Sequence, residues 1–210
     1  MSGALGHASA AALPARCGMA LKEWATVLEA MGRGEQLVLI RKGGLIEPGA
    51  GFQLVARQFV FYPTFEHQAV QYVRPPFQRY FEDAAARRAP SAEFRVELAG
   101  VVAASVRSRD PAIVARLARF HIYNEAFVSQ RLKWQPDQPL VVAIVRAFRL
   151  AEPCVVPVSP AYAGCTSWVQ LDAPVALDRA TPALDDRSFE ERLAALRPLL
   201  RQGSDPCEGV

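Results

Sequence analysis

The sequence predicts an α+β domain, in which a mixed, mostly antiparallel and partly closed β-sheet is flanked by helices. Three runs rich in β-branched and aromatic residues, at 37–40, 59–62 and 140–145, are typical of strands. Between them lie segments whose apolar residues recur every three or four positions, which is typical of helices. Apolar residues make up 51% of the 210-residue chain, enough for a sizeable core. A small closed barrel is one form that such a sheet can take.

We expect one globular domain over residues 19–200, with a flexible extension at 1–18 and a flexible tail at 201–210. Met19 begins the first patterned segment and is an alternative start to Met1. No apolar run reaches the roughly 18–20 residues that a membrane span needs, so we expect no membrane association. Four cysteines without CxxC spacing fit a reducing compartment, and the predicted location is cytoplasmic.

The first element predicted is an amphipathic helix over residues 20–31, where apolar residues fall at three- and four-residue spacing. Short strands at 37–40 and 59–62 follow, joined through an irregular stretch of about a dozen residues at 45–56. We expect these two strands to form an antiparallel pair with a large connecting loop. Their ends would then lie near one rim of the sheet.

The later elements alternate between helices and strands. The strand at 140–150 is the most apolar in the chain, so we place it in the middle of the sheet. Turn, capping and periodicity signals predict the other elements. In chain order these are a helix at 78–89, a strand at 93–106 bent at Gly100, a helix after Asp110-Pro111, a helix at 126–134, a strand at 168–171, and a helix that Ser188 begins with a capping box.

Polar residues that follow the predicted strands are the main candidates for a binding site. Arg41 and Lys42 stand beside two glycines, where cations and backbone amides can together bind an anion. Tyr62 and Trp168 lie at strand ends, where an aromatic ring can stack on a base. The predicted ligand-binding residues are Arg41, Lys42, Tyr62, Thr64, Glu66, His67, Gln68, Arg146 and Trp168.

A metal site is an alternative use of some of these residues. His67 follows Glu66 directly, and His121 and Glu125 are four apart, which places both on one helical face if the helix is continuous. These four residues could together bind a metal ion, although an imidazole such as that of His121 more often satisfies a backbone carbonyl. We predict no cofactor.

Familiar catalytic motifs are missing from the sequence. There is no G-x-S-x-G elbow, no phosphate-binding P-loop, and no aspartate followed by an acidic-x-Lys strand of the restriction-nuclease kind. Arg146 lies within an apolar strand, where it either faces solvent or needs an acidic partner, for which Glu66, Glu97 and Glu125 are candidates. The net charge of +3 is too small to establish a nucleic-acid partner by itself.

Five blocks of the chain together resemble the bacterial domain-of-unknown-function family 1802. They are Leu21-Lys-Glu-Trp24, Leu39-Ile-Arg-Lys-Gly-Gly44, Phe61-Tyr-Pro-Thr-Phe-Glu-His-Gln68, Arg131-Leu-Lys-Trp134 and Tyr162-Ala-Gly-Cys-Thr-Ser-Trp168. The resemblance covers residues 19–200 and implies no assigned activity. Because some members are joined to restriction-endonuclease-like domains, it implies a nucleic-acid context. By the order of its elements the chain is also similar to PUA-like modules such as ASCH and EVE, which bind RNA or modified bases.

Three functions follow from these observations. The leading one is a nucleic-acid-binding module in a restriction, defence or RNA-related context. In it Arg41 and Lys42 hold phosphate, Tyr62 or Trp168 stacks on a base, and residues 66–68 hydrogen-bond to its edge. The second is a metal-dependent phosphodiester hydrolase that uses Glu66, His67, His121 and Glu125. The third is a non-catalytic subunit that binds a protein partner.

Overall fold

The computed structural model describes residues 13–42, 51–164, 166–201 and 204–206. Its strands form one sheet in the order β2-β5-β4-β3-β1-β6, while β7 pairs with β5 and β8 pairs with β4. The β1–β3 pair is parallel and the remaining pairs are antiparallel. The strands are β1 (Arg16–Trp24), β2 (Val38–Arg41), β3 (Gln58–Thr64), β4 (Glu93–Ser108), β5 (Leu140–Pro157), β6 (Trp168–Ala176), β7 (Thr181–Pro182) and β8 (Ser204–Pro206).

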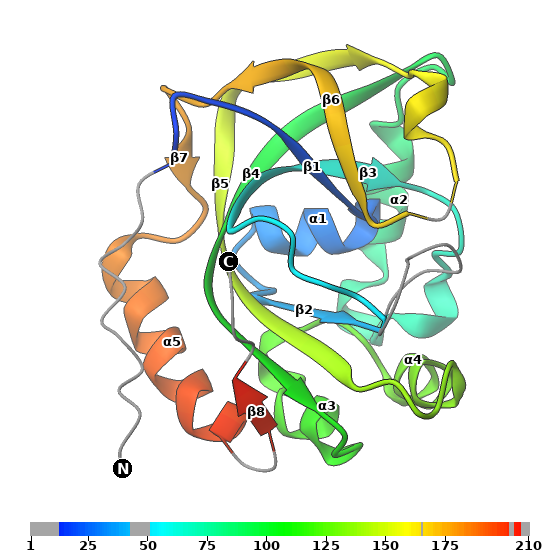
Figure 1. Cartoon of the computed structure of the whole chain (residues 1–210), viewed down its shortest axis with the longest axis vertical. Helices are drawn as coiled ribbons and strands as arrows, with labels where there is room; N and C mark the ends of the chain where they lie inside the picture. Colours follow the sequence, from blue (N-terminus) through cyan, green and yellow to red (C-terminus); the bar gives the residue numbers. More distant parts are fainter. Residues whose placement is uncertain (1–12, 43–50, 165, 202–203, 207–210) are drawn as a thin grey trace.

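The described residues also form five α-helices: α1 (Ala25–Gly32), α2 (Arg79–Ala86), α3 (Ala112–Arg116), α4 (Glu125–Lys133) and α5 (Asp186–Arg201). Four 3-10 turns complete the list: η1 (Val70–Tyr72), η2 (Pro75–Phe77), η3 (Ala118–Phe120) and η4 (Pro160–Tyr162). In Figure 1 the sheet curves around α1, with α5 on one side and α2 and α4 on the other. None of the helices in the described ranges is long and apolar enough to cross a membrane.

These features confirm the predicted α+β class with a mixed, mostly antiparallel sheet. The sheet is strongly curved, but its outer strands β2 and β6 do not pair with each other in the described part of the chain. The barrel that the sequence allowed is therefore left open.

The two longest strands, β4 and β5, pair with each other, and β5 lies inside the sheet as predicted. Gly100 lies in β4 between two shifts of register, at Val96/Leu98 and Val102/Ala104. A Cβ atom at Gly100 would lie 2.8 Å from Phe59 Cε2 and 2.8 Å from Val145 Cγ1. Glycine is therefore required here for close packing.

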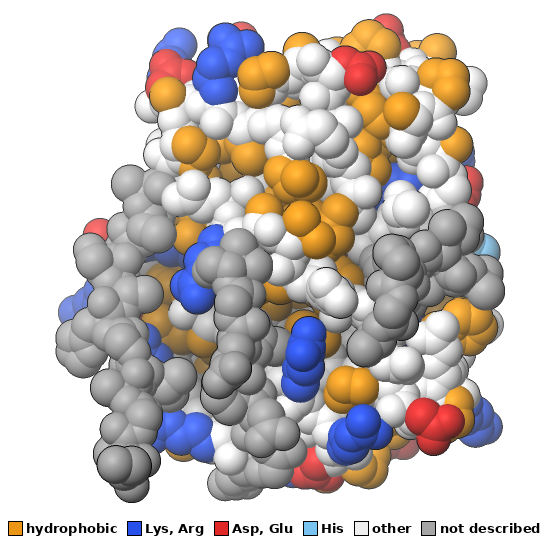
Figure 2. Space-filling model, viewed as in Figure 1, with side chains coloured by type: hydrophobic (Ala, Val, Ile, Leu, Met, Phe, Trp, Pro, Cys, Tyr) orange, Lys and Arg blue, Asp and Glu red, His pale blue; other side chains and the backbone are white. Residues whose placement is uncertain are grey.

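The core consists of two apolar clusters. The larger one lies between the sheet and the helices and includes Phe59, Tyr80 and Phe127, each at most 1% exposed. The smaller one lies where β1, β4 and β6 approach one another and includes Val60 and Phe94. On the face shown in Figure 2, hydrophobic side chains gather near the centre and most basic side chains lie towards the margin.

Two predictions for the first third of the chain are wrong. Residues 20–31 are not one helix, because β1 runs to Trp24 and α1 begins only at Ala25. The strands at 37–40 and 59–62 do not pair with each other: β2 pairs with β5, and β3 lies between β1 and β4. Both faces of β1 carry buried residues, so its sequence lacks the alternation that marks a half-exposed strand.

The ends of the domain also differ from expectation. Arg16 already belongs to β1, so Met19 lies inside a strand. At the other end, Ser204–Pro206 pairs with β4. Helix α5 begins before Ser188, and the capping acceptor is Asp185, whose Oδ1 accepts from the Ser188 N–H at 2.8 Å.

Candidate functional site

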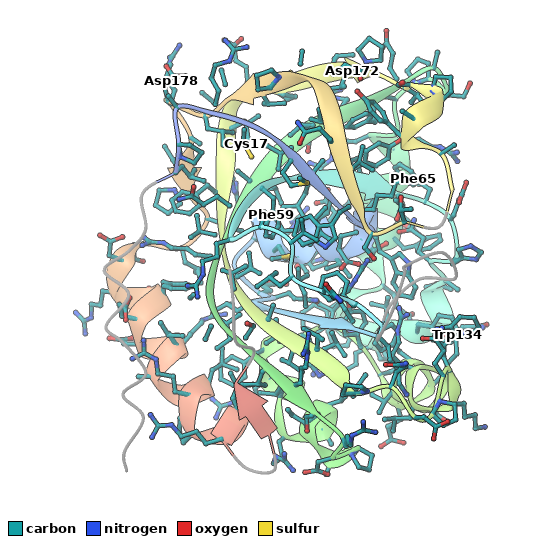
Figure 3. All side chains as sticks on the ribbon, in the orientation of Figure 1. Cys17, Phe59, Phe65, Trp134, Asp172 and Asp178 are labelled. Atoms are coloured by element: carbon teal, nitrogen blue, oxygen red, sulfur yellow. The ribbon has the colours of Figure 1, made fainter. Side chains whose placement is uncertain are left out.

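A cleft of about 1520 Å³ opens where several strand ends meet. Because β1 and β3 are parallel, their carboxyl ends lie at the same edge, with Trp24 paired to Thr64. The end of β2, the segment between η4 and β6, and the last turn of α4 also line the cleft, together with parts of α1, the end of α2, the start of β4 and the second half of β5. In Figure 3, Phe65 and Trp134 lie on the same side of the molecule, on two of these elements.

The lining of the cleft is strongly basic. Ten lysine and arginine residues face five glutamates, an excess of five positive charges, whereas the whole chain carries only +3. The cations are Lys22, Arg33, Arg41, Lys42, Arg87, Arg88, Arg95, Arg131, Lys133 and Arg149, and the glutamates are Glu23, Glu29, Glu66, Glu93 and Glu97. The positive charge of the protein is therefore concentrated here, where it attracts anions.

Arg41 lies in the cleft, but its charge is already matched by a carboxylate. Its Nη1 lies 3.1 Å from Glu23 Oε2, and its Nη2 donates to Ser167 Oγ at 2.8 Å. The Glu23 side chain is only 5% exposed, and its Oε1 accepts from the Trp24 N–H at 2.8 Å. Arg41 therefore ties β2 to β1 and to the segment before β6.

Arg131 of α4 has no such partner. Its guanidinium lies 5.1 Å from the centre of the Phe127 ring, which in turn stacks on Tyr123 at 3.8 Å. Arg131 makes no side-chain hydrogen bond or ion pair with any residue in the described ranges. Burial, and then the neighbouring charge of Arg41, lowers the pKa of Arg131.

Lys42 lines the cleft and also binds a backbone carbonyl near the C-terminus of α4. It is 3% exposed, and its Nζ donates to the carbonyl of Leu132 at 3.1 Å, near the C-terminus of α4. An ammonium group there also interacts favourably with the helix dipole. Burial, followed by the charge of Arg131, lowers the pKa of Lys42.

Among the aromatic residues that line the cleft, Trp134 has the ring that is most accessible for stacking with a ligand. It follows α4 directly, is 39% exposed, and makes no ring contact with another described aromatic residue. By contrast, Tyr62 stacks on Phe94 at 3.8 Å, and the Arg88 guanidinium lies 4.8 Å from the Phe65 ring. The indole of Trp134 can therefore accept a stacking partner that the other rings already have.

The end of β3 and the segment after it contribute four of the predicted site residues to the cleft. Tyr62, Thr64, Glu66 and His67 all line it, and the last two are exposed. His67 adopts a left-handed backbone conformation, with φ of 61°. Burial, and then the charge of Glu66, raises the pKa of Tyr62.

Gln68 does not line the cleft. Its Oε1 accepts hydrogen bonds from the Thr26 N–H at 3.3 Å and from the Thr26 hydroxyl at 3.1 Å. Gln68 thus caps the N-terminus of α1, where no local side chain does so.

Two further predicted site residues, Arg146 and Trp168, do not line the cleft. Arg146 forms an ion pair with Asp186 of α5 and packs against Phe189, away from Glu66, Glu97 and Glu125. Trp168 donates from Nε1 to the Gln53 carbonyl at 2.8 Å and stacks on Phe52. Its indole is thus used in packing.

Comparison with protein families decides where the chain belongs. A family model described as "Domain of unknown function (DUF1802)" matches residues 20–195. The chain belongs to the DUF1802 family. The resemblance seen in the five sequence blocks is thereby confirmed, and no curated protein matches this DUF1802 chain.

Among solved structures, the DUF1802 chain is similar to the ASCH protein of Zymomonas mobilis. A crystal structure of a serine-to-alanine variant of ZmASCH gives a TM-score of 0.40 at 13% identity, covering 88% of this chain and 99% of that one. The structure titled as ASCH from the same organism gives 0.39 at 11% identity, covering 85% and 94%.

The metal site predicted for Glu66, His67, His121 and Glu125 is not assembled. His121 is 2% exposed: its Nε2 lies 2.9 Å from the Val114 carbonyl, and its Nδ1 accepts from the Tyr123 N–H at 3.2 Å. Both ring nitrogens are thus occupied, and neither His121 nor Glu125 lines the cleft with His67. Within the described ranges no three His, Cys, Asp or Glu side chains are grouped as metal ligands. The four residues proposed for a metal-dependent hydrolase therefore do not form one site.

Arg131, Trp134 and Glu23 were not predicted as site residues, although the sequence contained a signal for them. All three lie in two of the blocks that carry the family resemblance. Their chemistry emerges only when α4, β1 and β2 meet.

Proposed function

We propose that this DUF1802 domain binds single-stranded nucleic acid in the cleft. The observation that carries the proposal is the exposed Trp134 indole beside a lining with twice as many cations as carboxylates. Positive grooves with aromatic side chains are the usual means by which proteins bind single strands, because phosphates attract the cations and bases stack on the rings.

The size of the cleft supports an extended ligand. Pockets for small molecules usually have volumes of about 300–1,000 Å³, whereas this cleft measures about 1520 Å³. A flexible strand can follow such a groove and present unpaired bases to it. In a duplex the bases would be stacked and out of reach of Trp134.

The residues take different roles in this proposal. Lys133 and Arg131 attract the sugar–phosphate chain, while Trp134 stacks on a base. Thr64, Glu66 and His67 are placed to hydrogen-bond to base edges, since they line the same cleft and two of them are exposed. Arg41 positions the strand ends through Glu23 and Ser167. A defence or RNA-related context and a cytoplasmic location stay predictions.

The decisive experiment removes the stacking surface. We expect Trp134→Ala to weaken binding of a fluorescently labelled 12-nucleotide single strand by about 5- to 150-fold, which corresponds to about 1–3 kcal/mol per stacked base. Fluorescence anisotropy at low salt measures the affinity. Trp134→Phe is the matched control, because it keeps an aromatic face and should retain most of the affinity.

Two outcomes would contradict the proposal. The unmodified protein could fail to bind single strands at low salt, or Trp134→Ala could bind as tightly as the unmodified protein. Because Trp134 is exposed and makes no described ring contact, its replacement should leave the unfolding midpoint within the usual range for surface substitutions.

A further inference from the structure

The cleft has an unbalanced charge at the end of α4. The charge of Arg131 acts on Lys42, the charge of Arg41 acts on Arg131, and Glu23 is the carboxylate that contacts Arg41. Asp137 also acts on Lys42, but less strongly than Arg131 does, and it is exposed outside the cleft. Among the described residues, three cations share one buried carboxylate here, which is an excess of about two positive charges.

The Arg131 side chain is held in a shape suited to an anion. Its guanidinium lies on Phe127, which is supported by the ring of Tyr123, so one flat face is fixed by packing. A fixed guanidinium loses little freedom when its N–H groups form two parallel bonds to an oxyanion. Lysine in this position would provide charge without that fork.

We propose that the α4 end of the cleft is a subsite for a terminal phosphate of the bound strand, with Arg131 as the group that contacts it. The subsite rests on the nucleic-acid function proposed above: the α4 end of the cleft would bind the phosphorylated end of the strand. A phosphomonoester carries about −1.5 to −2 charges near pH 7, whereas an internal phosphodiester carries only one. The excess of about two positive charges matches the former.

The position of α4 supports the same choice. Arg131, Lys133 and Trp134 at the end of α4 all line the cleft, so a cation that can contact a phosphate and a ring that can stack on a base lie close together in the chain. Burial is the main cause of the lowered pKa values of Lys42 and Arg131, and a neighbouring cation adds to it in each case: Arg131 beside Lys42, and Arg41 beside Arg131. A bound dianion would offset this repulsion between cations.

The test compares single strands of one sequence that differ only at their ends: one with a 5′-phosphate, one with a 3′-phosphate and one with neither. For the unmodified protein we expect one of the phosphorylated strands to bind at least about tenfold more tightly than the unphosphorylated strand. Arg131→Gln should abolish this difference, and Arg131→Lys should retain only part of it. Arg187→Gln, an exposed substitution on α5 outside the cleft, should leave the difference unchanged.

A measurement on the unmodified protein keeps the test independent of how the variants fold. Inorganic phosphate should remove the advantage of the phosphorylated strand while leaving the affinity of the unphosphorylated strand nearly unchanged. Equal affinities for all three strands, or a difference that survives Arg131→Gln, would overturn the terminal-phosphate subsite.

The same experiment separates the two proposals. If the unphosphorylated strand binds with a salt-dependent affinity and a terminal phosphate adds nothing, nucleic-acid binding stands and the subsite is refuted. If inorganic phosphate binds through Arg131 but no strand binds, the cleft is a site for small phosphate compounds and the nucleic-acid function is refuted.

Discussion

His121 illustrates at the scale of one residue how burial assigns a structural role to a reactive group. Its Nε2–H donates to the Val114 carbonyl, and its Nδ1 accepts from the Tyr123 N–H, an arrangement that requires a neutral ring. Burial lowers the pKa of His121 from 6.5 to about 4, and the nearby charge of Arg74 acts in the same direction. The ring is therefore a link between α3 and the segment before α4.

This burial makes stability depend on pH in a defined window. As the pH falls below 6.5 the unfolded chain takes up a proton at His121, while the folded protein resists until about pH 4. The contribution is complete above pH 6.5 and is lost progressively below it. We expect the free energy of unfolding to fall by about 2 kcal/mol from this group between pH 7.5 and pH 5.

Urea unfolding at the two pH values measures this loss. His121→Gln should lower stability at pH 7.5 but remove the His121 component of the pH dependence. Asp110 and Asp185 have pKa values lowered by their hydrogen bonds, so their contributions are lost at lower pH. An unchanged difference between pH 7.5 and pH 5 in the variant would contradict the assignment.

Individual site residues were only partly predictable from the sequence. Tyr62, Thr64, Glu66 and His67 lie at or just after the end of a recognisable strand, and all four line the cleft. The partner of Arg146 could not be predicted, because Asp186 lies 40 positions away and reaches it through the packing of α5 on β5.

At the scale of elements, the junction of β1 and α1 decides how the cleft is built. The apolar spacing between residues 20 and 31 looks helical because it joins two elements: a strand buried on both faces and the helix that follows it without a loop. The sequence was sufficient to predict that β2, β3, β4 and β5 are strands, because each has a distinct apolar run. It was not sufficient to predict which strands pair, because β1 and its parallel partner β3 are some 40 residues apart in the chain.

Helix α1 depends on a cap from a distant segment, and removing that cap should be costly. The Thr26 N–H and hydroxyl are fully buried and share the Gln68 carboxamide oxygen as their acceptor. We expect Gln68→Ala to lower the free energy of unfolding by about 1–2 kcal/mol, because water cannot readily replace the acceptor. Gln71→Ala, an exposed change nearby, is the matched control and should stay within about 0.5 kcal/mol.

Denaturant unfolding of both variants, together with Thr26→Val and the double variant, tests this link. Coupling between Gln68 and Thr26 should appear as non-additive losses, since removal of either partner removes the same bond. Additive effects at the two positions would show that the bond from the Thr26 hydroxyl to Gln68 contributes nothing, and an unchanged stability of Gln68→Ala would show the same for the cap as a whole.

At the scale of the whole molecule, the excess of basic residues is concentrated in the cleft and is not distributed evenly over the protein. The net charge of +3 hides a cleft with an excess of five cations, so the remainder of the protein is slightly acidic. Composition alone therefore underestimated the electrostatic case for an anionic ligand. Three of the five glutamates in the cleft lie within ion-pair distance of arginines of the same lining, which holds those side chains in place.

The position of the charge, and not its total, should determine how the protein responds to salt. Lys133→Gln with Arg88→Gln removes two exposed cations from the cleft, and Arg187→Gln with Arg201→Gln removes two exposed cations from α5. Both double variants have the same net charge. We expect only the cleft variant to reduce the slope of log affinity against log salt, by about 0.7 for each phosphate of a single strand that is no longer neutralised.

Anisotropy titrations of one unphosphorylated strand at four or five salt concentrations give the slopes. The slope is the decisive quantity because it reports how many phosphates the protein neutralises, whereas affinity could also change through the Phe65 ring that Arg88 now covers. Equal reductions of the slope in the two variants would mean that the strand senses only the overall charge of the protein. A reduction confined to the cleft variant locates the strand between α4 and the end of β3.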